Sequence, residues 1–314
     1  MDLDTVKERA GPRQFSPKDD MPEEYRKAAT RMIQFHANSE VMGGYLDKVF
    51  TRMAPSLDRK LACTAKTQDE IGHAQLLYRA AETLGVKTRE EMLDELERGD
   101  GKFLNCFHYP VSSWYEAPMI DFFVDGGAMR RQATLKSTSW EPYAHAMDKV
   151  CFEEGFHVKH GEDILRELMR SSKANQERTQ EVFDTWWPRI LQFFGPMNSQ
   201  STHNDFAQQV GLKTVSNSEL RQAFLNAYIP KAEKYGLEIP DEPRIEYDEE
   251  TGKYAVVEED LDWDEFWTIA KNDYEGSYEQ IGSRRQRHEA VAWVREAMDG
   301  WEHNSAGTTP QAAD

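Results

Sequence analysis

The sequence predicts a mainly α-helical protein in which four long helices form a bundle, followed by extra C-terminal helices and one small β-hairpin. Long stretches without a helix breaker alternate with short segments that place proline or a capping residue at a helix start. Hydrophobic residues make up 39% of the 314 residues, which is enough apolar material to close a large core. One short segment, near residue 250, has the alternation and the turn residues of a hairpin.

Residues 1–20 are polar and are expected to form an extended N-terminal arm. Four long helices follow in the prediction, and each is entered through a segment that contains proline. Early carboxylates such as Glu23 also favour the positive end of the first helix dipole. A short acidic helix is expected over 88–97. The predicted bounds of the four long helices are 21–52, 55–85, 114–138 and 142–170.

The chain changes character after a further helix predicted over 174–194. The stretch 195–217 is rich in Ser, Asn and Gln and is predicted to be a loop. Ser216 is a capping residue for the next helix, which is expected to end near Gly236. The residues 244–257 then read as a β-hairpin.

Two more helices, over 263–272 and 283–301, complete the predicted elements. The polar end of the chain is expected to be disordered. The predicted domains are therefore an N-terminal arm (1–20), a helical bundle (21–194), a C-terminal helical extension with the hairpin (195–302) and a tail (303–314).

The charge balance excludes some classes of function. Lys and Arg number 38 and Asp and Glu 56, so the formal net charge is −18. This argues against binding to nucleic acids or anionic membranes, because both need basic surfaces. No apolar run approaches the ~18 residues of a membrane span, and the N-terminal residues lack the basic and apolar regions of a secretory signal.

The three cysteines form neither a disulfide framework nor a C-x-x-C pair, so we expect a cytoplasmic protein. The excess of acid itself has three possible explanations. The carboxylates keep the protein soluble, they adapt it to high salt, or some of them form a buried cluster that binds metal. Composition does not choose between these explanations, but the spacing of the carboxylates does.

Two matching sequence motifs on two of the predicted helices indicate a metal-binding site. Asp69-Glu70-Ile71-Gly72-His73 and Glu153-Glu154-Gly155-Phe156-His157 both read acid-Glu-x-x-His. Glu and His three residues apart share one helix face, so one metal ion can bind both. A single Glu-x-x-His arises by chance in acidic helical proteins. The test is whether the other two helices supply matching ligands.

Glu40 and Asp125 supply them. Glu70 follows Glu40 by 30 residues, and the midpoint is Pro55, which opens the turn between the two helices. Glu154 follows Asp125 by 29 residues, with the midpoint at the next predicted break. Antiparallel helices joined at these points carry both members of each pair at one depth, as in ferritin-like di-metal carboxylate bundles. We therefore predict a ferritin-like bundle with the ligands Glu40, Glu70, His73, Asp125, Glu154 and His157.

This donor set indicates the kind of metal. Four carboxylates and two imidazoles offer two adjacent ions a mixed oxygen and nitrogen shell in which carboxylates can bridge. Such a shell fits iron or manganese better than zinc, whose structural sites are usually rich in Cys and His. Two ferrous ions can reduce dioxygen by two electrons. Asp69 and Glu153, each four residues before a histidine, are candidates for hydrogen bonds that fix an imidazole tautomer.

These residues, in this order, resemble the catalytic oxygenase subunits of ring-1,2-phenylacetyl-CoA epoxidases, which are bacterial multicomponent di-iron monooxygenases. The similarity extends over most of the chain, from about 21 to about 301. Its most specific pieces are His36–Glu40, Gln68–His73, Val124–Ala128, Glu153–His157 and Trp186–Pro188.

The resemblance implies a di-iron centre held by the six ligands, and insertion of one oxygen atom across the aromatic ring of phenylacetyl-CoA in aerobic phenylacetate catabolism. It implies electrons from NADPH through a separate flavin and iron–sulfur reductase and, as partner, a ferritin-like structural subunit. Phe35 stands where the resemblance leads us to expect a polar residue. Coenzyme A enters as part of the aryl-CoA substrate, and the positions that resemble the family's CoA-contacting segments are Arg31, Lys102, Phe103, Leu104, Asn105 and Lys213.

Three other functions fit part of the pattern. A di-iron oxygenase for another aryl-CoA, such as benzoyl-CoA, would share the ligands and differ in the pocket. An iron-storage or ferroxidase protein would be a shorter chain with no need for residues 195–301. A non-catalytic scaffold subunit would lack ligands, whereas all six are present here.

Overall fold

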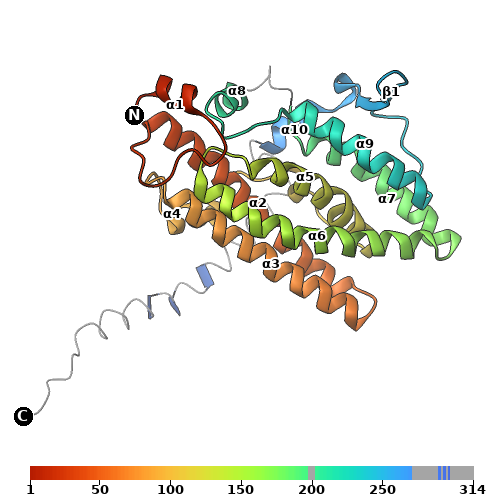
Figure 1. Ribbon diagram of the computed structural model, residues 1–314. Helices are drawn as coiled ribbons and strands as arrows, with labels where there is room; N and C mark the ends of the chain where they lie inside the picture. Colours follow the sequence, from red (N-terminus) through yellow and green to blue (C-terminus); the bar gives the residue numbers. More distant parts are fainter. Residues whose placement is uncertain (197–201, 271–288, 291–292, 295, 298–314) are drawn as a thin grey trace, which may run out of the picture.

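The protein is described by a computed structural model, and its fold is mainly α-helical as the sequence predicts (Figure 1). The long helices lie roughly along one another, and a two-stranded hairpin sits at one edge (Figure 1). No helix of the described part of the chain has both the length and the apolarity that crossing a bilayer requires. The structure describes residues 1–196, 202–270, 289–290, 293–294 and 296–297.

The helices α2 (Glu23–Met53) and α3 (Leu57–Glu82) form the first antiparallel pair, within a few residues of the predicted bounds. Ser56 caps α3, because its side chain accepts a hydrogen bond from the amide of Arg59. The sequence Gly43-Gly44 lets the pair approach closely. A Cβ at Gly44 would lie 3.3 Å from the Cβ of Glu70. Close helix packing is therefore the reason for this glycine pair.

The predicted third helix is interrupted, which corrects the sequence interpretation. A single 3-10 turn, η2 (Trp114–Glu116), leads to the π-helical segment η3 (Met119–Val124), and only then does α5 (Asp125–Leu135) begin. The wide π turn packs against Gly161 of the next helix, where a Cβ would lie 2.4 Å from the amide nitrogen of Phe122. A π segment of this kind is often found at functional sites.

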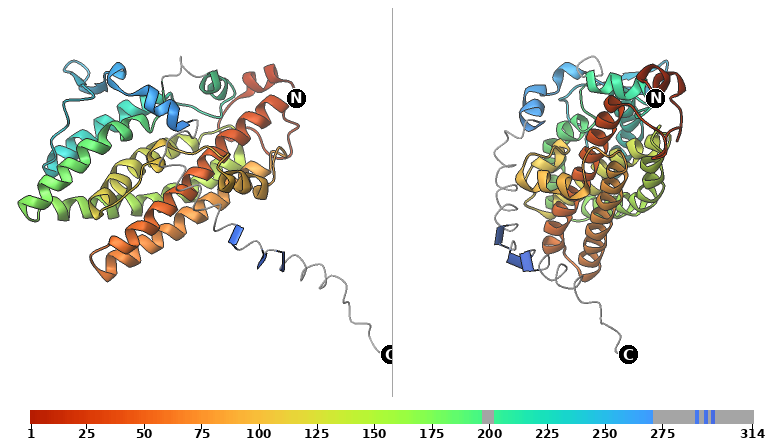
Figure 2. Two further views of the ribbon diagram at one scale, coloured as in Figure 1. Left: turned by 180° about the vertical axis from the view of Figure 1, so that it is seen from behind. Right: turned by 90° about the vertical axis from the view of Figure 1, so that its left-hand side faces the viewer.

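The second pair of bundle helices is completed by α6 (Glu141–Met169), which packs against η3, α5 and α3. Next to η3 and α5 lie α7 (Lys173–Gln192) and α9 (Asn217–Tyr235), and buried aromatic rings join both to η3 through the contacts Phe123–Phe183 and Phe123–Tyr228 (Figures 1 and 2). Trp186 and Trp187 of α7 are both buried in this layer, so they serve packing.

The N-terminal arm and the predicted loop contain helices that the sequence interpretation missed. The arm forms α1 (Leu3–Arg9), capped by Asp2, and its Phe15 is buried and accepts and donates backbone hydrogen bonds beside Trp140. The predicted loop contains α8 (Thr202–Gln209), whose Ala207 is buried. In both places tertiary burial overrides a polar local composition.

The remaining elements follow the prediction. A short helix, α4 (Arg89–Arg98), has a capping box at Thr88 and ends at Gly99 in the left-handed conformation. The strands β1 (Ile245–Asp248) and β2 (Lys253–Val256) form an antiparallel hairpin against α9.

Three short elements complete the described fold. The 3-10 turn η5 (Glu258–Asp260) leads to α10 (Trp263–Ala270), and η1 (Asn105–His108) lies between α4 and η2. The predicted helix over 283–301 lies for the most part outside the described residues, and the predicted tail over 303–314 lies wholly outside them. The division of the chain into domains at these points stays a prediction.

Candidate metal centre and adjoining pocket

The six predicted ligands meet in the middle of the four-helix bundle. Glu40 comes from α2, Asp125 from the first position of α5, and a Glu–His pair from each of α3 and α6. All six side chains are buried. Burial of four carboxylates is costly unless they are paired or bind metal, so the cluster needs a compensating positive charge.

The ligand atoms form two overlapping groups. One contains Glu40 and His73, the other contains Asp125 and His157, and both contain Glu70 and Glu154. Within each group the ligand atoms lie within 4.8 Å of one another. The two groups therefore describe two neighbouring ion positions that share two carboxylates.

The shared carboxylates direct their two oxygens to different histidines. For Glu70, Oε2 lies 3.8 Å from Nδ1 of His73 and Oε1 lies 3.4 Å from Nδ1 of His157. For Glu154, Oε1 lies 3.9 Å from His73 Nδ1 and Oε2 lies 3.3 Å from His157 Nδ1. Each carboxylate thus spans the space between the two imidazoles, as a bridging ligand would.

The outer nitrogens of the two histidines contact the acidic residues that precede the ligating glutamates. Nε2 of His73 lies 3.0 Å from Oε2 of Glu153, and Nε2 of His157 lies 3.3 Å from Oδ2 of Asp69. Each acid therefore contacts the histidine of the other helix. This contact leaves Nδ1 of each histidine to face the cluster.

A buried lysine, Lys66, lies within the cluster and was not identified from the sequence. Its Nζ is 2.7 Å from Oδ2 of Asp125, 2.8 Å from Oδ1 of Asp121 and 3.1 Å from Oδ1 of Asp47. It precedes Glu70 by four residues, so the two share a helix face. That spacing is the sequence signal that could have indicated it.

Two further polar residues brace the carboxylates. Nε2 of His36 lies 2.8 Å from Oε1 of Glu40, one helical turn away. The side-chain amide of Gln132 donates to Oε1 of Glu40 at 3.3 Å and to Oε1 of Glu154 at 3.2 Å. Gln132 follows Asp125 by two helical turns, a spacing that places both on one face of α5.

The pKa values reflect this crowding of charges. Burial alone would lower the pKa of both imidazoles, but hydrogen bonds and the charges of nearby glutamates raise the pKa of His73 to about 11 and of His157 to about 12. Burial opposes the charge of Lys66, yet the surrounding carboxylates hold its pKa well above the ordinary value. Burial also raises the pKa of Asp125 well above its usual range, against the effect of Lys66.

The donor set fits two metal ions. It combines four carboxylates, two imidazoles with Nδ1 directed inward, and a shell of hydrogen-bonding partners, all of which are features of di-metal helical bundles. Iron and manganese accept such oxygen-rich shells. Binding to both Nδ1 atoms requires the histidines to lose a proton, because an imidazole binds metal in its neutral form.

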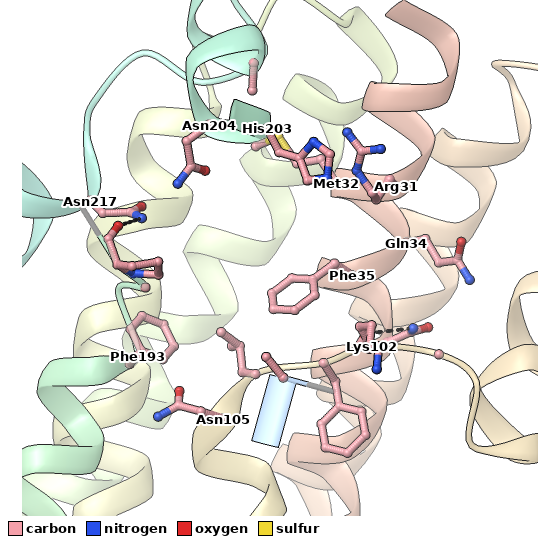
Figure 3. Close-up of a pocket in the computed structure, with 18 of the residues that line it drawn as sticks. Arg31, Met32, Gln34, Phe35, Lys102, Asn105, Phe193, His203, Asn204 and Asn217 are labelled. Atoms are coloured by element: carbon pink, nitrogen blue, oxygen red, sulfur yellow. Dashed lines mark hydrogen bonds between the residues drawn. The ribbon is translucent and has the colours of Figure 1, made fainter. Parts of the chain in front are cut away.

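Beside the cluster lies a cavity of about 520 Å³, and all six residues predicted to contact CoA line it (Figure 3). Arg31 projects from α2, Lys102 to Leu104 form the segment before η1, Asn105 is the first residue of η1, and Lys213 precedes α9. Phe35, the departure from the expected polar residue, also lines the cavity. The size suits a ligand larger than a simple aromatic acid.

The segment Lys102–Asn105 is held in place by residues next to the predicted ligand Glu40. The side-chain amide of Asn38 donates to the carbonyl of Lys102 at 2.9 Å, and the hydroxyl of Ser39 accepts from the amide of Leu104 at 3.1 Å. The motif His36–Glu40 therefore connects the cavity wall to the carboxylate–histidine cluster.

A second, smaller cavity of about 30 Å³ lies against four of the predicted ligands, Glu40, Glu70, Asp125 and Glu154. Leu104, Arg131 and Phe193 line both cavities, so they form the wall between the large cavity and the carboxylates. Among residues that sequence reasoning missed, Arg131 is notable because it places a guanidinium at this junction. No motif in the sequence identifies Arg131 as a site residue.

The large cavity is positively charged in places, although the chain is acidic overall. Burial, together with the nearby charge of Arg131, lowers the pKa of Lys213 to about 7. The charge of Arg31, followed by burial, lowers the pKa of His203. Lys213 also donates a hydrogen bond to the side chain of Asn217. The cavity is also lined by basic and acidic side chains of other segments, namely Arg31, Lys87, Lys102 and Arg131 beside Glu95 and Asp100. The basic groups outnumber the acidic ones, which favours an anionic ligand.

Two comparisons relate the chain to known proteins. Residues 5–293 match the family described as "Phenylacetic acid catabolic protein". A curated relative from Escherichia coli (strain K12), which is one of the subunits of "1,2-phenylacetyl-CoA epoxidase", is 37% identical over 284 residues. These residues are 90% of this chain and 90% of the relative.

Proposed function

The chain belongs to the phenylacetic acid catabolic protein family, and we propose on that premise that it is the oxygenase subunit of a multicomponent di-iron monooxygenase. Its reaction is epoxidation of the aromatic ring of phenylacetyl-CoA, with dioxygen and with electrons from an NADPH-dependent reductase, in aerobic phenylacetate catabolism. The observation that carries the proposal is the wall of Leu104, Arg131 and Phe193, which a large ligand cavity shares with a buried carboxylate–histidine cluster.

We propose that the cluster holds two irons. Glu40 and His73 would hold one ion and Asp125 and His157 the other, while Glu70 and Glu154, which belong to both groups of candidate ligands, would serve both ions. When bound, the metal pair supplies two-electron reduction of dioxygen. The bracing contacts of Gln132 to Glu40 and Glu154 keep these carboxylates in position before a ligand arrives.

The large cavity is proposed to hold the CoA moiety. The phosphates carry most of its charge, and Arg31, Lys102 and Lys213 can receive them as hydrogen-bond donors and cations. With the phosphates at these residues, the acyl end points to Leu104 and Phe193, whose apolar side chains suit an aromatic ring. The ring then stands beside the carboxylates, and the same side chains exclude water from it.

The side chains around the cluster are placed to hold protons at defined atoms. Glu153 and Asp69 accept from Nε2 of the two histidines, which frees Nδ1 for a metal ligand role. Nδ1 of His36 meets the hydroxyl of Tyr143 at 2.8 Å, while Nε2 faces Glu40. His36 thus connects a ligand carboxylate to a phenol through a chain of hydrogen bonds.

The proposal includes partners and a location. The name of the relative makes it one subunit of its enzyme, so it works with other subunits. We propose that the partners of this chain are a flavin and iron–sulfur reductase and a ferritin-like structural subunit, and that its compartment is the cytoplasm. A cavity of about 520 Å³ beside the cluster favours an oxygenase over a ferroxidase, which needs only a path for iron.

The experiment is a turnover assay with purified components. It combines the chain, the reductase, the structural subunit, NADPH and dioxygen, and compares phenylacetyl-CoA with benzoyl-CoA and with free phenylacetate. We expect NADPH-dependent formation of the ring epoxide from phenylacetyl-CoA. Preferred turnover of benzoyl-CoA would replace the proposed substrate, and iron uptake without turnover of any acyl-CoA would contradict the oxygenase assignment.

A further inference from the structure

The outer surface of α3 carries a stripe of uncharged residues. Leu57 and Leu61 are 70% and 60% exposed, and Ile71 is 37% exposed. The stripe has six positions on α3, and each follows the one before it by four or three residues in alternation, which places all six on one side of the helix. No charged residue of α3 falls on these positions, in a chain with 30% charged residues. The stripe consists of Leu57, Leu61, Thr64, Gln68, Ile71 and Gln75.

The neighbouring helix α6 continues this surface. Phe152 and Phe156 are 70% and 63% exposed, and their rings meet edge to face with centroids 5.5 Å apart. The contacts Asp69–His157 and Glu153–His73 run in opposite directions along the two helices, so α3 and α6 are antiparallel. Figure 1 shows them side by side on the face toward the viewer.

Two glycines lie at the centre of the same surface. Gly72 of α3 and Gly155 of α6 are interior helical positions, and a Cβ added at either would meet no described atom within 4 Å. Glycine lowers the stability of a helix, so a glycine inside a helix usually permits a close packing contact. Gly161 makes such a contact with Phe122, whereas Gly72 and Gly155 make none with the described part of the chain.

We propose that this surface docks a helix of another subunit of the same enzyme, one whose facing side is apolar and uncharged. We call it the α3–α6 face, and it consists of the α3 stripe with Gly72, Phe152, Gly155 and Phe156. The inference rests on the proposed function, because that function supplies the partner subunit. Alternating steps of four and three are the pattern of helix–helix packing, and the glycines admit the partner's backbone closely.

The composition of the α3–α6 face favours a permanent subunit over the other occupants. Complexes with electron carriers are small and transient, whereas permanent subunit interfaces are larger and more hydrophobic. A reductase therefore fits a face with exposed Leu61 and Phe156 poorly. A second copy of this chain would bring together two proteins with a net charge of −18, which opposes self-association.

The α3–α6 face also lies next to the metal centre. Asp69 and Glu153 stand at its edge, 37% and 21% exposed at the side chain, and each contacts a buried histidine. A helix docked on Ile71 and Phe156 covers these carboxylates from water. Assembly would then stiffen the contacts that orient the two imidazoles.

The test measures binding of the purified chain to the purified ferritin-like structural subunit by sedimentation velocity. The double variant Leu61→Glu/Phe156→Glu places two charges in the proposed interface. We expect its affinity to fall by about 30-fold or more, the loss typical of residues at the centre of an interface. Leu93→Glu on α4 is the matched control, because Leu93 is as exposed as Ile71 and lies on another helix. Its affinity should stay at the wild-type value.

A second variant separates docking from folding. Gly155→Ala should raise the thermal midpoint of the free chain, because alanine favours a helix, and yet weaken the complex, because the partner backbone loses its close approach. Wild-type affinity in both the double variant and Gly155→Ala would overturn the inference. A homodimer of the wild-type chain that the double variant dissociates would assign the face to a second copy instead.

Failure of the inference and failure of the proposed function give different results. If the structural subunit binds all variants equally, and turnover of phenylacetyl-CoA is normal, the function holds and the docking face is wrong. If the wild-type chain uses the α3–α6 face to bind the structural subunit but no acyl-CoA is oxidised, the face holds and the function is wrong. A wild-type chain that does not bind the structural subunit contradicts the proposed occupant.

Discussion

Oδ2 of Asp69 on α3 lies 3.3 Å from Nε2 of His157 on α6, so the acid of one motif supports the histidine of the other. Glu153 and His73 repeat the relationship in the opposite direction at 3.0 Å. The two Glu-x-x-His motifs therefore support each other, and each candidate ion position depends on both helices. This mutual support arises only when the two helices pack together, so neither motif reveals it alone.

The crossed contact predicts which ion position each acid controls. Asp69→Asn should weaken metal binding by about 10- to 100-fold at the position that His157 serves, because the imidazole loses the partner that orients it. Metal titration of the purified chain should show that Asp69→Asn and His157→Ala weaken one class of site and Glu153→Gln and His73→Ala the other. Loss of the same class in all four variants would contradict the crossed arrangement.

Lys66 is expected to stabilise the metal-free protein. Lys66→Met leaves Asp47, Asp121 and Asp125 buried without their shared cation, which should lower the free energy of unfolding by about 3–5 kcal/mol. Urea denaturation without metal measures this. The control is Lys159→Met, which removes an exposed ion pair on α6 and should cost less than about 1 kcal/mol. Equal effects of the two variants would show that Lys66 is not the compensating charge.

The pKa of Lys213 predicts a pH dependence for CoA binding. Burial and the charge of Arg131 lower the pKa to about 7, so the amine is largely neutral above that pH in the free protein. A bound phosphate favours the charged amine, so at pH 8 to 9 binding should take up a proton and the affinity should fall as pH rises. Calorimetry in buffers with different heats of ionisation measures the uptake. It should vanish in Lys213→Met and persist in Arg31→Met; uptake that survives in Lys213→Met would assign the proton elsewhere.

Three helical glycines should respond differently to alanine. In the free chain, Gly72→Ala and Gly155→Ala should each add about 1 kcal/mol to the free energy of unfolding, because the new methyl group meets no described atom. Gly161→Ala should instead lose about 1–3 kcal/mol, because its Cβ would collide with the backbone of Asp121 and Phe122. Thermal or chemical denaturation of the three variants checks this. A destabilising Gly155→Ala would mean that the position has a packing role within the chain.

Much of the bundle and the meeting of the six candidate ligands inside it could be predicted, because both depend on spacing along helices. The distance from Glu40 to Glu70 about the turn at Pro55 places the two at one depth in any antiparallel pair. The hairpin near residue 250 follows from its turn residues. These features depend on neighbouring residues or on a regular spacing along the chain, so they can be predicted from a single sequence.

The parts that the sequence did not reveal depend on tertiary contacts. Lys66 reads as a solvated lysine until three aspartates from other segments surround it. The π segment before Asp125 depends on Gly161 of another helix. The helix α8 lies in a stretch whose composition favours a loop, and burial of Ala207 decides otherwise.

The iron content of ligand variants tests the central claim most directly, namely that two ions share Glu70 and Glu154. Anaerobically reconstituted wild-type chain should hold about two irons. Asp125→Ala/His157→Ala should keep about one, because Glu40 and His73 still bind with the bridging carboxylates, whereas Glu70→Ala/His157→Ala should lose both. Circular dichroism verifies that each variant is folded. A wild-type chain without iron, or folded variants that retain about two irons, would contradict the account.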